Sequence, residues 1–284
     1  MPTEKRARQK AARRKKRAAQ VRRVRIRRRL RTGGFVAGGG VVVLVVALAS
    51  AGVFSGGSTP PKKSGTTTTT TTTSKATTTQ KLQAAADRLA VAAHCPPTPK
   101  TRTNTKHWSS PPPMTIDPTK TYTATVTTAA GSFVVTLDAK AAPNTVNNFV
   151  FLADQGFYNC STFHRVVPGF MDQTGDPTGT GSGGPGYEFA NENVPASYTS
   201  GDVAMANSGG TATNGSQFFV LVPGGTKTLN ADLAQGNKYS LFGTVTSGMT
   251  VVTKINSEGN STPKANGVPP KVVQRILTVK IKTS

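Results

Sequence analysis

A stretch of twenty residues without a charge, at residues 35–54, divides this chain into parts of different character. A helix of that length rises about 1.5 Å per residue and spans roughly 30 Å, the thickness of the hydrocarbon layer of a membrane. No other part of the sequence is long and apolar enough to cross a membrane. The pattern therefore predicts a single transmembrane helix at residues 35–54.

The basic tail at residues 1–34 predicts how that helix is oriented. The tail holds 16 Lys and Arg residues and one acidic residue. Because basic flanks stay on the cytoplasmic side, we expect a cytoplasmic N-terminus, with everything after residue 54 outside the cytoplasm. A cleaved signal peptide, and hence a secreted protein, is the alternative, since residues 47–49 and 49–51 fit the small-x-small cleavage pattern. The length of the basic region favours the anchor.

The formal net charge of +23 is concentrated in the tail and the segment that follows it. Residues 114–284 hold 11 basic and 10 acidic residues. A nearly neutral domain lacks the basic surface of nucleic-acid-binding proteins, so no nucleic-acid partner is expected, although a tail that contacts nucleic acid or anionic lipid is an alternative. Two cysteines exclude a disulfide-rich scaffold and a cysteine-based zinc cluster. No metal site is expected, because His164 is the one histidine beyond the linker.

Residues 55–113 form a low-complexity linker rich in Thr and Pro, with eight consecutive threonines at 66–73. Such a composition buries too little apolar surface to form a core and predicts disorder. Residues 80–94 are an exception, because Leu82 and Leu89 follow a helical spacing. A short helix is predicted there, ahead of a domain at residues 114–284.

The domain shows the patterns of many short strands. Residues 122–128 and 133–137 alternate around a turn and predict a hairpin. Further apolar runs predict strands at 163–167, 170–173, 203–206, 218–222, 241–245 and 276–281. Pro143 begins a predicted helix whose apolar residues recur at helical spacing, and a second is predicted at 249–255. The whole indicates a closed β-barrel capped by helices.

The glycine-rich residues 179–184 match the G-x-G-x-x-G pattern of dinucleotide sites in form only. A nucleotide site needs a strand directly before the glycines and a helix directly after them. No predicted strand directly precedes these glycines, and Pro185 interrupts any helix that follows. We therefore predict a flexible surface loop.

Residues 163–176, with the sequence FHRVVPGFMDQTGD, resemble the core motif of the cyclophilins, the cyclosporin-binding class of peptidyl-prolyl isomerases. Three further stretches resemble the family in the same order: a glycine loop at 179–187, a groove strand at 205–207 with 214–219, and a closing segment at 239–245. The resemblance covers residues 121–282. It implies a mainly β fold, an eight-stranded antiparallel barrel with two capping helices, and no cofactor. Together with the predicted transmembrane helix, it leads us to expect a bacterial, membrane-anchored member of the family.

The resemblance implies two catalytic residues, Arg165 and Gln173. A guanidinium is always charged and presents its donors in a fixed fork. Arg165 would therefore stabilise the twisted amide of an X–Pro bond, and Gln173 would orient Arg165 or bond the substrate backbone. On composition alone, Phe170 and Phe219 would be core residues. The residues implied to bind the substrate are His164, Phe170, Met171, Ala206, Asn207, Gln217, Phe219, Leu229 and Tyr239.

The sequence departs from the common cyclophilin pattern in two places. Many members have Trp-Leu-Asp where this chain has Thr-Leu-Asn at residues 228–230, and extra residues follow before Tyr239. Tyr239 itself stands where the common pattern has a histidine. The missing tryptophan weakens the expectation of tight cyclosporin binding more than that of catalysis. The extra residues leave the alignment of Leu229 open.

The expected function is isomerisation of X–Pro bonds in proline-containing polypeptides, assisting the folding of exported proteins, by a monomer. A peptide-binding module of the same fold without catalysis is the alternative. An exported domain meets an oxidising compartment, so Cys95 and Cys160 are hypothesised to form one disulfide. Two independent thiols are the alternative, since a pairing cannot be deduced from sequence.

Overall fold

The protein is described by a computed structural model over residues 76–99, 104–210 and 212–284. The predicted basic tail, transmembrane helix and threonine run lie outside these residues. Among the helices of the described ranges, none has the length and apolar character needed to cross a membrane. The described residues all fall within one compact unit, residues 70–284.

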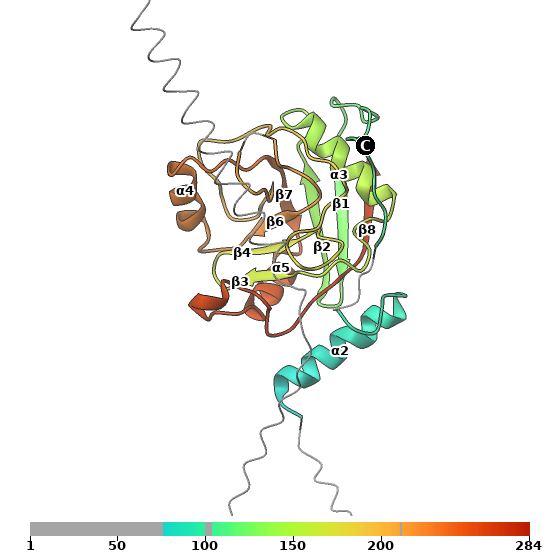
Figure 1. Cartoon of the computed structure of the whole chain (residues 1–284), viewed down its shortest axis with the longest axis vertical. Coiled ribbons are helices and arrows are strands. Elements are labelled where there is room, and N and C mark those ends of the chain that lie inside the picture. Colours follow the sequence, from blue (N-terminus) through green and yellow to red (C-terminus); the bar gives the residue numbers. More distant parts are fainter. Residues whose placement is uncertain (1–75, 100–103, 211) are drawn as a thin grey trace, which may run out of the picture. The chain divides into compact units, whose positions relative to one another are not determined.

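The described residues form eight short strands that pair antiparallel in one sheet, in the order β3-β4-β6-β5-β7-β2-β1-β8 (Figure 1). The strands are β1 (Tyr122–Thr128), β2 (Gly131–Leu137), β3 (Arg165–Val167), β4 (Met171–Thr174), β5 (Asp202–Met205), β6 (Phe218–Leu221), β7 (Leu241–Ser247) and β8 (Ile276–Thr283). Each strand expected from the sequence is present. β1 alternates between buried and partly exposed residues, whereas β5 and β6 are buried throughout, so both alternation and short apolar runs predicted strands correctly.

The closed barrel expected from the sequence is corrected by the structure. β3 and β8 are the edge strands, and no ladder joins them within the described residues. They approach at a single bridge between Thr162 and Arg275, just before each strand begins. β3 is only three residues long and runs into Pro168, whose missing N–H cannot continue a ladder. The sheet is therefore curled like half of a barrel.

Two predicted helices cover the sheet. α3 (Pro143–Asp154) packs on β8, and α5 (Met249–Ser257) packs on β2, β3 and β4 (Figure 1). The Glu192 carboxylate caps α3, accepting a hydrogen bond from the backbone N–H of Thr145 at 2.8 Å. Gly248 precedes α5 with φ +79°, and a Cβ there would come within 2.5 Å of a backbone oxygen. Both helix starts are therefore fixed by contacts with residues that are distant in the chain.

The main core lies between these helices and the sheet. Phe149 of α3 packs against Phe218 and Phe242, with ring centroids 5.4 and 5.2 Å apart. A second, smaller apolar cluster is separate from this core. Its buried members are Met171, Tyr198, Ala204, Phe219, Leu221 and Leu229.

A helix before the domain, α2 (Thr78–Ala92), starts two residues earlier than the sequence pattern indicated. It is fastened to the sheet region by a disulfide between Cys95 and Cys160. Asp87 of α2 also pairs with the guanidinium of Arg275 at 2.6 Å, and the Arg275 side chain is only 1% exposed. Because a buried cation without a partner is strongly destabilising, the Asp87 carboxylate makes α2 part of the folded unit.

The described part of the predicted linker also packs on the domain. Asn104 donates a hydrogen bond to the carbonyl of Phe157 at 2.8 Å. The Trp108 ring lies edge-on to Phe151, with centroids 5.1 Å apart. Residues 104–113 therefore act as a strap against α3 rather than as a free spacer.

Candidate active site

A cavity of about 160 Å³ opens at the smaller apolar cluster. It is lined by Arg165, Phe170, Met171, Gln173, Ala206, Asn207, Phe219, Leu229, Asp232 and Tyr239. All of the catalytic and binding residues expected from the sequence line it, except His164 and Gln217. Asp232 is one lining residue that the sequence did not single out.

Strand register brings the central residues together. Arg165 of β3 lies opposite Gln173 of β4, and Gln173 lies opposite Phe219 of β6. Residues directly opposite each other in an antiparallel pair point to the same face of the sheet. One row of side chains therefore presents a cation, an amide and an aromatic ring to the same cavity.

The guanidinium of Arg165 is held from two sides. Its Nη1 donates to Gln173 Oε1 at 3.2 Å, while Nε and Nη2 donate to the backbone and side-chain oxygens of Asn266 at 3.2 and 2.9 Å. Burial lowers the pKa of Arg165, and Tyr239 and Asp232 oppose that shift. The group stays charged, since a guanidinium is not deprotonated in proteins. Asn266 was missed because it lies 101 residues away in the chain.

The apolar wall of the cavity comes from β4, β6 and α4 (Thr226–Ala234). Phe219 is 5% exposed, and its ring lies edge-on to that of Tyr239, with centroids 5.5 Å apart. Leu229 of α4 is 1% exposed. The sequence did not predict α4, because Leu229 is the only residue of this helix that is buried. A helix with one buried residue leaves no periodic apolar stripe to detect.

His164 does not line the cavity, although it precedes Arg165. Its side chain is buried, close to the backbone of Thr162 and the side chain of Gln217. Successive residues of an extended segment point to opposite faces, so Arg165 and its neighbour cannot both face the substrate side. Burial is the largest of several influences on the pKa of His164, and it lowers that pKa. His164 therefore lies outside the lining of the cavity, and its expected contact with a substrate stays a prediction.

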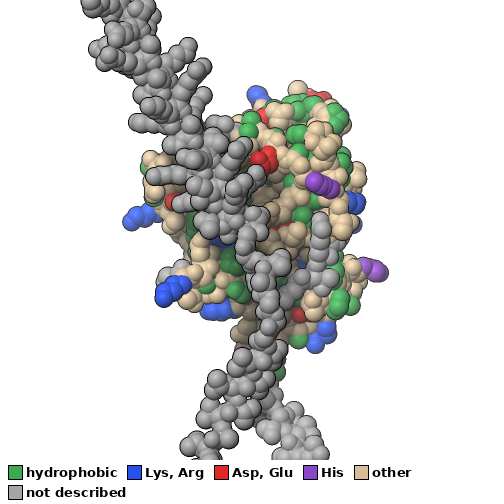
Figure 2. Space-filling view, viewed as in Figure 1, with side chains coloured by type: hydrophobic (Ala, Val, Ile, Leu, Met, Phe, Trp, Pro, Cys, Tyr) green, Lys and Arg blue, Asp and Glu red, His purple; other side chains and the backbone are tan. Residues whose placement is uncertain are grey.

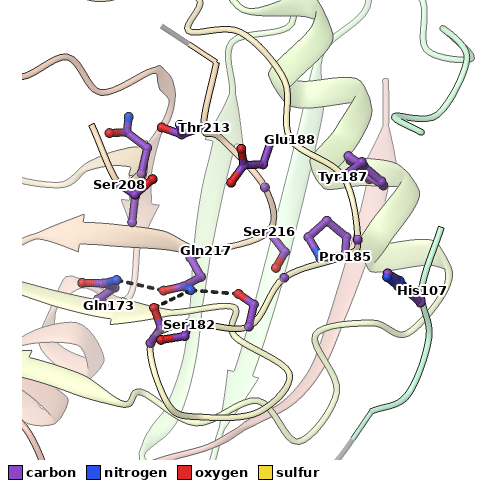
Figure 3. Close-up of a pocket in the computed structure, with 17 residues that line it drawn as sticks. His107, Gln173, Ser182, Pro185, Tyr187, Glu188, Ser208, Thr213, Ser216 and Gln217 are labelled. Atoms are coloured by element: carbon purple, nitrogen blue, oxygen red, sulfur yellow. Dashed lines mark hydrogen bonds between the residues drawn. The ribbon is translucent and has the colours of Figure 1, made fainter. Parts of the chain in front are cut away.

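A larger polar groove of about 880 Å³ adjoins the cavity and shares Gln173, Ala206 and Asn207 with it. Figure 3 shows Gln217 between Gln173 and the loop that carries Ser182. The Gln173 amide donates to Gln217 Oε1 at 3.0 Å. Gln217 Nε2 in turn donates to two carbonyl oxygens of the glycine loop, at 3.1 and 2.9 Å. A chain of hydrogen bonds thus joins Arg165 to the wall of the groove.

The glycine loop is tied to one carboxylate, that of Asp176. The Asp176 oxygens accept the backbone N–H groups of Thr178, Thr180, Gly181 and Gly183. Burial raises the pKa of Asp176, but these hydrogen bonds outweigh it and leave the pKa below its ordinary value. A Cβ on Gly183 would come within 2.0 Å of the carboxylate. The loop expected to be flexible is therefore fastened at its centre.

On the face that Figure 2 shows, the visible charged side chains form no single block. The Lys and Arg side chains are spread around the outline of the domain. This distribution agrees with the balance of basic and acidic residues in the domain sequence. The described part of the chain also holds no cluster of His, Cys, Asp and Glu that could bind a metal ion.

Comparisons with known proteins agree with this geometry. The peptidyl-prolyl cis-trans isomerase A of Mycobacterium tuberculosis is 39% identical over 186 residues, which are 57% of this chain and 95% of that protein. The peptidyl-prolyl cis-trans isomerase-like 1 of Aspergillus fumigatus is 43% identical over 157 residues, which are 52% of this chain and 92% of that protein.

A crystal structure of a cyclophilin type peptidyl-prolyl cis-trans isomerase from Cryptosporidium parvum is similar, with a TM-score of 0.50 and 28% identity, over 58% of this chain and 99% of that one. The family model described as cyclophilin type peptidyl-prolyl cis-trans isomerase/CLD matches residues 123–281. This chain therefore belongs to the cyclophilin-type peptidyl-prolyl cis-trans isomerases, enzymes of class EC 5.2.1.8.

Proposed function

We propose that this isomerase acts on exported polypeptides and that Arg165 stabilises the twisted X–Pro amide. The observation that carries the proposal is the place of the Arg165 guanidinium, at the edge of an apolar cavity. Its hydrogen bonds to Gln173 and Asn266 use three N–H groups. A guanidinium has five. Within the described residues, two N–H groups are left to bond a substrate.

The chemistry needs neither a nucleophile nor a proton transfer. Rotation about an X–Pro bond is slow because amide resonance sets a barrier of about 18–20 kcal/mol. In the twisted state resonance is lost, and the prolyl nitrogen becomes a better hydrogen-bond acceptor. A charged donor such as Arg165 therefore binds the twisted state more strongly than the planar state, which is the condition for catalysis.

Magnitudes limit what Arg165 contributes alone. A hydrogen bond to a charged group is worth about 1.5–3 kcal/mol, which corresponds to roughly one to two powers of ten in rate. The remaining acceleration comes from holding the substrate. The apolar side chains of Met171, Phe219 and Leu229 suit a proline ring. Gln173 and Asn266 hold the guanidinium in place, so little reorganisation is needed during the reaction.

The test is a peptide-isomerisation assay on the full chain. Arg165→Ala should lower kcat/KM by about tenfold to a hundredfold. Arg165→Lys should lose most activity too, because an ammonium lacks the planar fork that meets Gln173 and Asn266 together. Arg88→Ala, which removes an exposed arginine of α2, is the matched control and should keep full activity. Full activity in Arg165→Ala would refute the proposed role of Arg165, whereas a wild-type chain that binds the peptide but does not isomerise it would be a peptide-binding module.

The proposed setting is the outer face of a bacterial cell membrane, with the N-terminus in the cytoplasm. The uncharged stretch at residues 35–54 and its basic flank support this location. The bond between Cys95 and Cys160 also supports it, because disulfides persist in oxidising compartments. A bacterial host stays a prediction, since the similar proteins include both fungal and bacterial ones.

Protease treatment of intact spheroplasts tests the location. The domain should be digested while the basic tail stays protected. A domain released into the medium, with an N-terminus near residue 50, would show cleavage and secretion instead. Non-reducing peptide mapping of the native protein should recover Cys95 linked to Cys160, and two alkylatable thiols would count against export.

A further inference from the structure

One acidic side chain lines the cavity, and it comes from the part of the sequence that departs from the common cyclophilin pattern. The extra residues between Asn230 and Tyr239 complete helix α4. Leu229 and Asp232 of this helix both line the cavity. They are three residues apart, so they lie on the same side of the helix. Helix α4 therefore places an apolar side chain and a carboxylate at the same cavity.

The Asp232 carboxylate is not committed to another group of the described chain. Its side chain makes no hydrogen bond or ion pair with the described residues, and only its backbone carbonyl accepts hydrogen bonds, from the N–H groups of Gln235 and Asn237. Arg165, the one basic residue that lines the cavity, is held by Gln173 and Asn266 instead. Asp232 is half-buried, so a bound peptide can reach it.

The charge of Asp232 shifts the pKa values of two other residues that line the cavity. It raises the pKa of Arg165 against the larger effect of burial, which lowers it. It also adds to the effect of burial in raising the pKa of Tyr239. The carboxylate therefore lies within electrostatic range of both groups, without forming an ion pair with Arg165 in the described structure.

We infer that Asp232 is a specificity-determining residue that favours substrates with a Lys or Arg beside the proline. The inference rests on the proposed function, because it takes the apolar cavity as the seat of the proline ring. A ring bound against Phe219 and Leu229 leaves the side chains of the flanking residues at the rim. A basic side chain there gains an ion pair with Asp232, and an acidic one is repelled.

Arg165 does not cancel this preference. Its guanidinium is fixed by Gln173 and Asn266, and its remaining donors face the substrate amide in the proposed mechanism. The carboxylate of Asp232 has no such partner, so it is the charge left to meet a flanking side chain. Pairs of this kind at partly exposed positions are modest, so we expect a preference of about two- to fivefold.

The experiment compares peptides that carry Lys, Ala or Glu on either side of one proline. Both kcat/KM and the dissociation constant are measured for the full chain. We expect the order Lys, Ala, Glu at one or both positions, with the preference shrinking at high salt. Asp232→Asn should abolish the difference between the Lys and Glu peptides, and Asp232→Lys should reverse it.

Asp154→Asn is the matched control, because it removes the same charge from an exposed position at the end of α3. It should keep the wild-type preference. Equal changes for all three peptides in Asp232→Asn, or no change, would overturn the inference.

Binding separates this inference from the proposed function. A chain that prefers the Lys peptide in binding but isomerises none would refute catalysis and support the role of Asp232. A chain that isomerises all three peptides equally would support catalysis and refute the role of Asp232.

Discussion

β4 and the glycine loop that follows it each bury one carboxylate, and their surroundings shift the two pKa values in opposite directions. Asp172 of β4 and Asp176 at the base of the loop are both almost fully hidden from solvent. Burial raises the pKa of Asp172 to about 7, with one opposing hydrogen bond from Asn256. Four backbone N–H groups donate hydrogen bonds to the Asp176 carboxylate, and its pKa is lowered. The number of donors, more than burial, decides the charge state.

The strands and the glycine loop also differ in how they shape the site. The cavity is built on strands, where the register of β3, β4 and β6 fixes Arg165, Gln173 and Phe219. The groove wall is a loop without strand pairing, and its shape depends on the Asp176 carboxylate. Groups that must be placed accurately for the reaction therefore come from the sheet. In the proposed function, the contact with the rest of the substrate comes from the loop.

The largest expected effect is on the sheet side. Phe219→Ala should lower the free energy of unfolding by about 3–5 kcal/mol, because it empties a buried site between β4 and α4. In the assay it should act mainly on KM, since ring binding is lost equally from ground state and transition state. Urea unfolding and steady-state kinetics measure both. Phe170→Ala, on a less buried ring, should show the KM effect with a smaller loss of stability. Equal losses of stability in Phe219→Ala and Phe170→Ala would contradict this distinction.

A smaller effect is expected on the loop side. Asp176→Ala leaves the N–H groups of the loop without their acceptor and should destabilise the protein by about 1–3 kcal/mol. It should raise KM for long peptides more than for short ones, because the groove wall loses its shape. Asp138→Ala serves as the control, since that exposed carboxylate accepts one backbone N–H, from Ala141. If the two variants lose the same stability, the loop does not depend on Asp176.

The carboxylates themselves can be compared through pH. An aspartate in the unfolded chain has a pKa of about 3.9, whereas burial raises the pKa of folded Asp172 to about 7. Between these values the native state keeps a proton that the unfolded state has lost. Asp172 therefore lowers stability progressively as the pH rises from about 4 to about 7, and no further above that.

Asp172→Asn should remove this dependence. The variant should exceed the wild type in stability at pH 8, and the difference should close towards pH 4, as measured by urea unfolding at several pH values. An unchanged difference across that range would show that Asp172 does not titrate in the native protein there.

The smallest expected effect is that of pH on catalysis. Burial lowers the pKa of His164, which keeps its imidazole neutral near pH 7. Asp172 neighbours Gln173 on β4 and therefore points to the opposite face from the cavity. We expect kcat/KM to change less than about twofold between pH 6.5 and 8, under conditions where the protein stays folded. A steep profile that disappears in His164→Gln would contradict a mechanism without proton transfer.

Local patterns were enough to predict most elements of the domain. Pro143 marked the start of α3, and the alternation at residues 122–128 predicted β1 within its observed bounds. The family motif predicted which residues meet at the cavity, with His164 and Gln217 as the exceptions. The helix α4 escaped detection because it buries a single residue, Leu229. These outcomes reflect how much periodic burial each element has.

By itself the sequence determined where the strands and the helices α2, α3 and α5 form, and that Arg165 belongs to an isomerase motif. Only the tertiary structure decided the partners. Asn266 reaches Arg165 from 101 residues away, and Asp87 pairs with Arg275 across 188 residues. The structure also decided that the sheet stays open between β3 and β8. Periodicity records which face of an element is buried, whereas the order of strands and the packing of loops decide what that face meets.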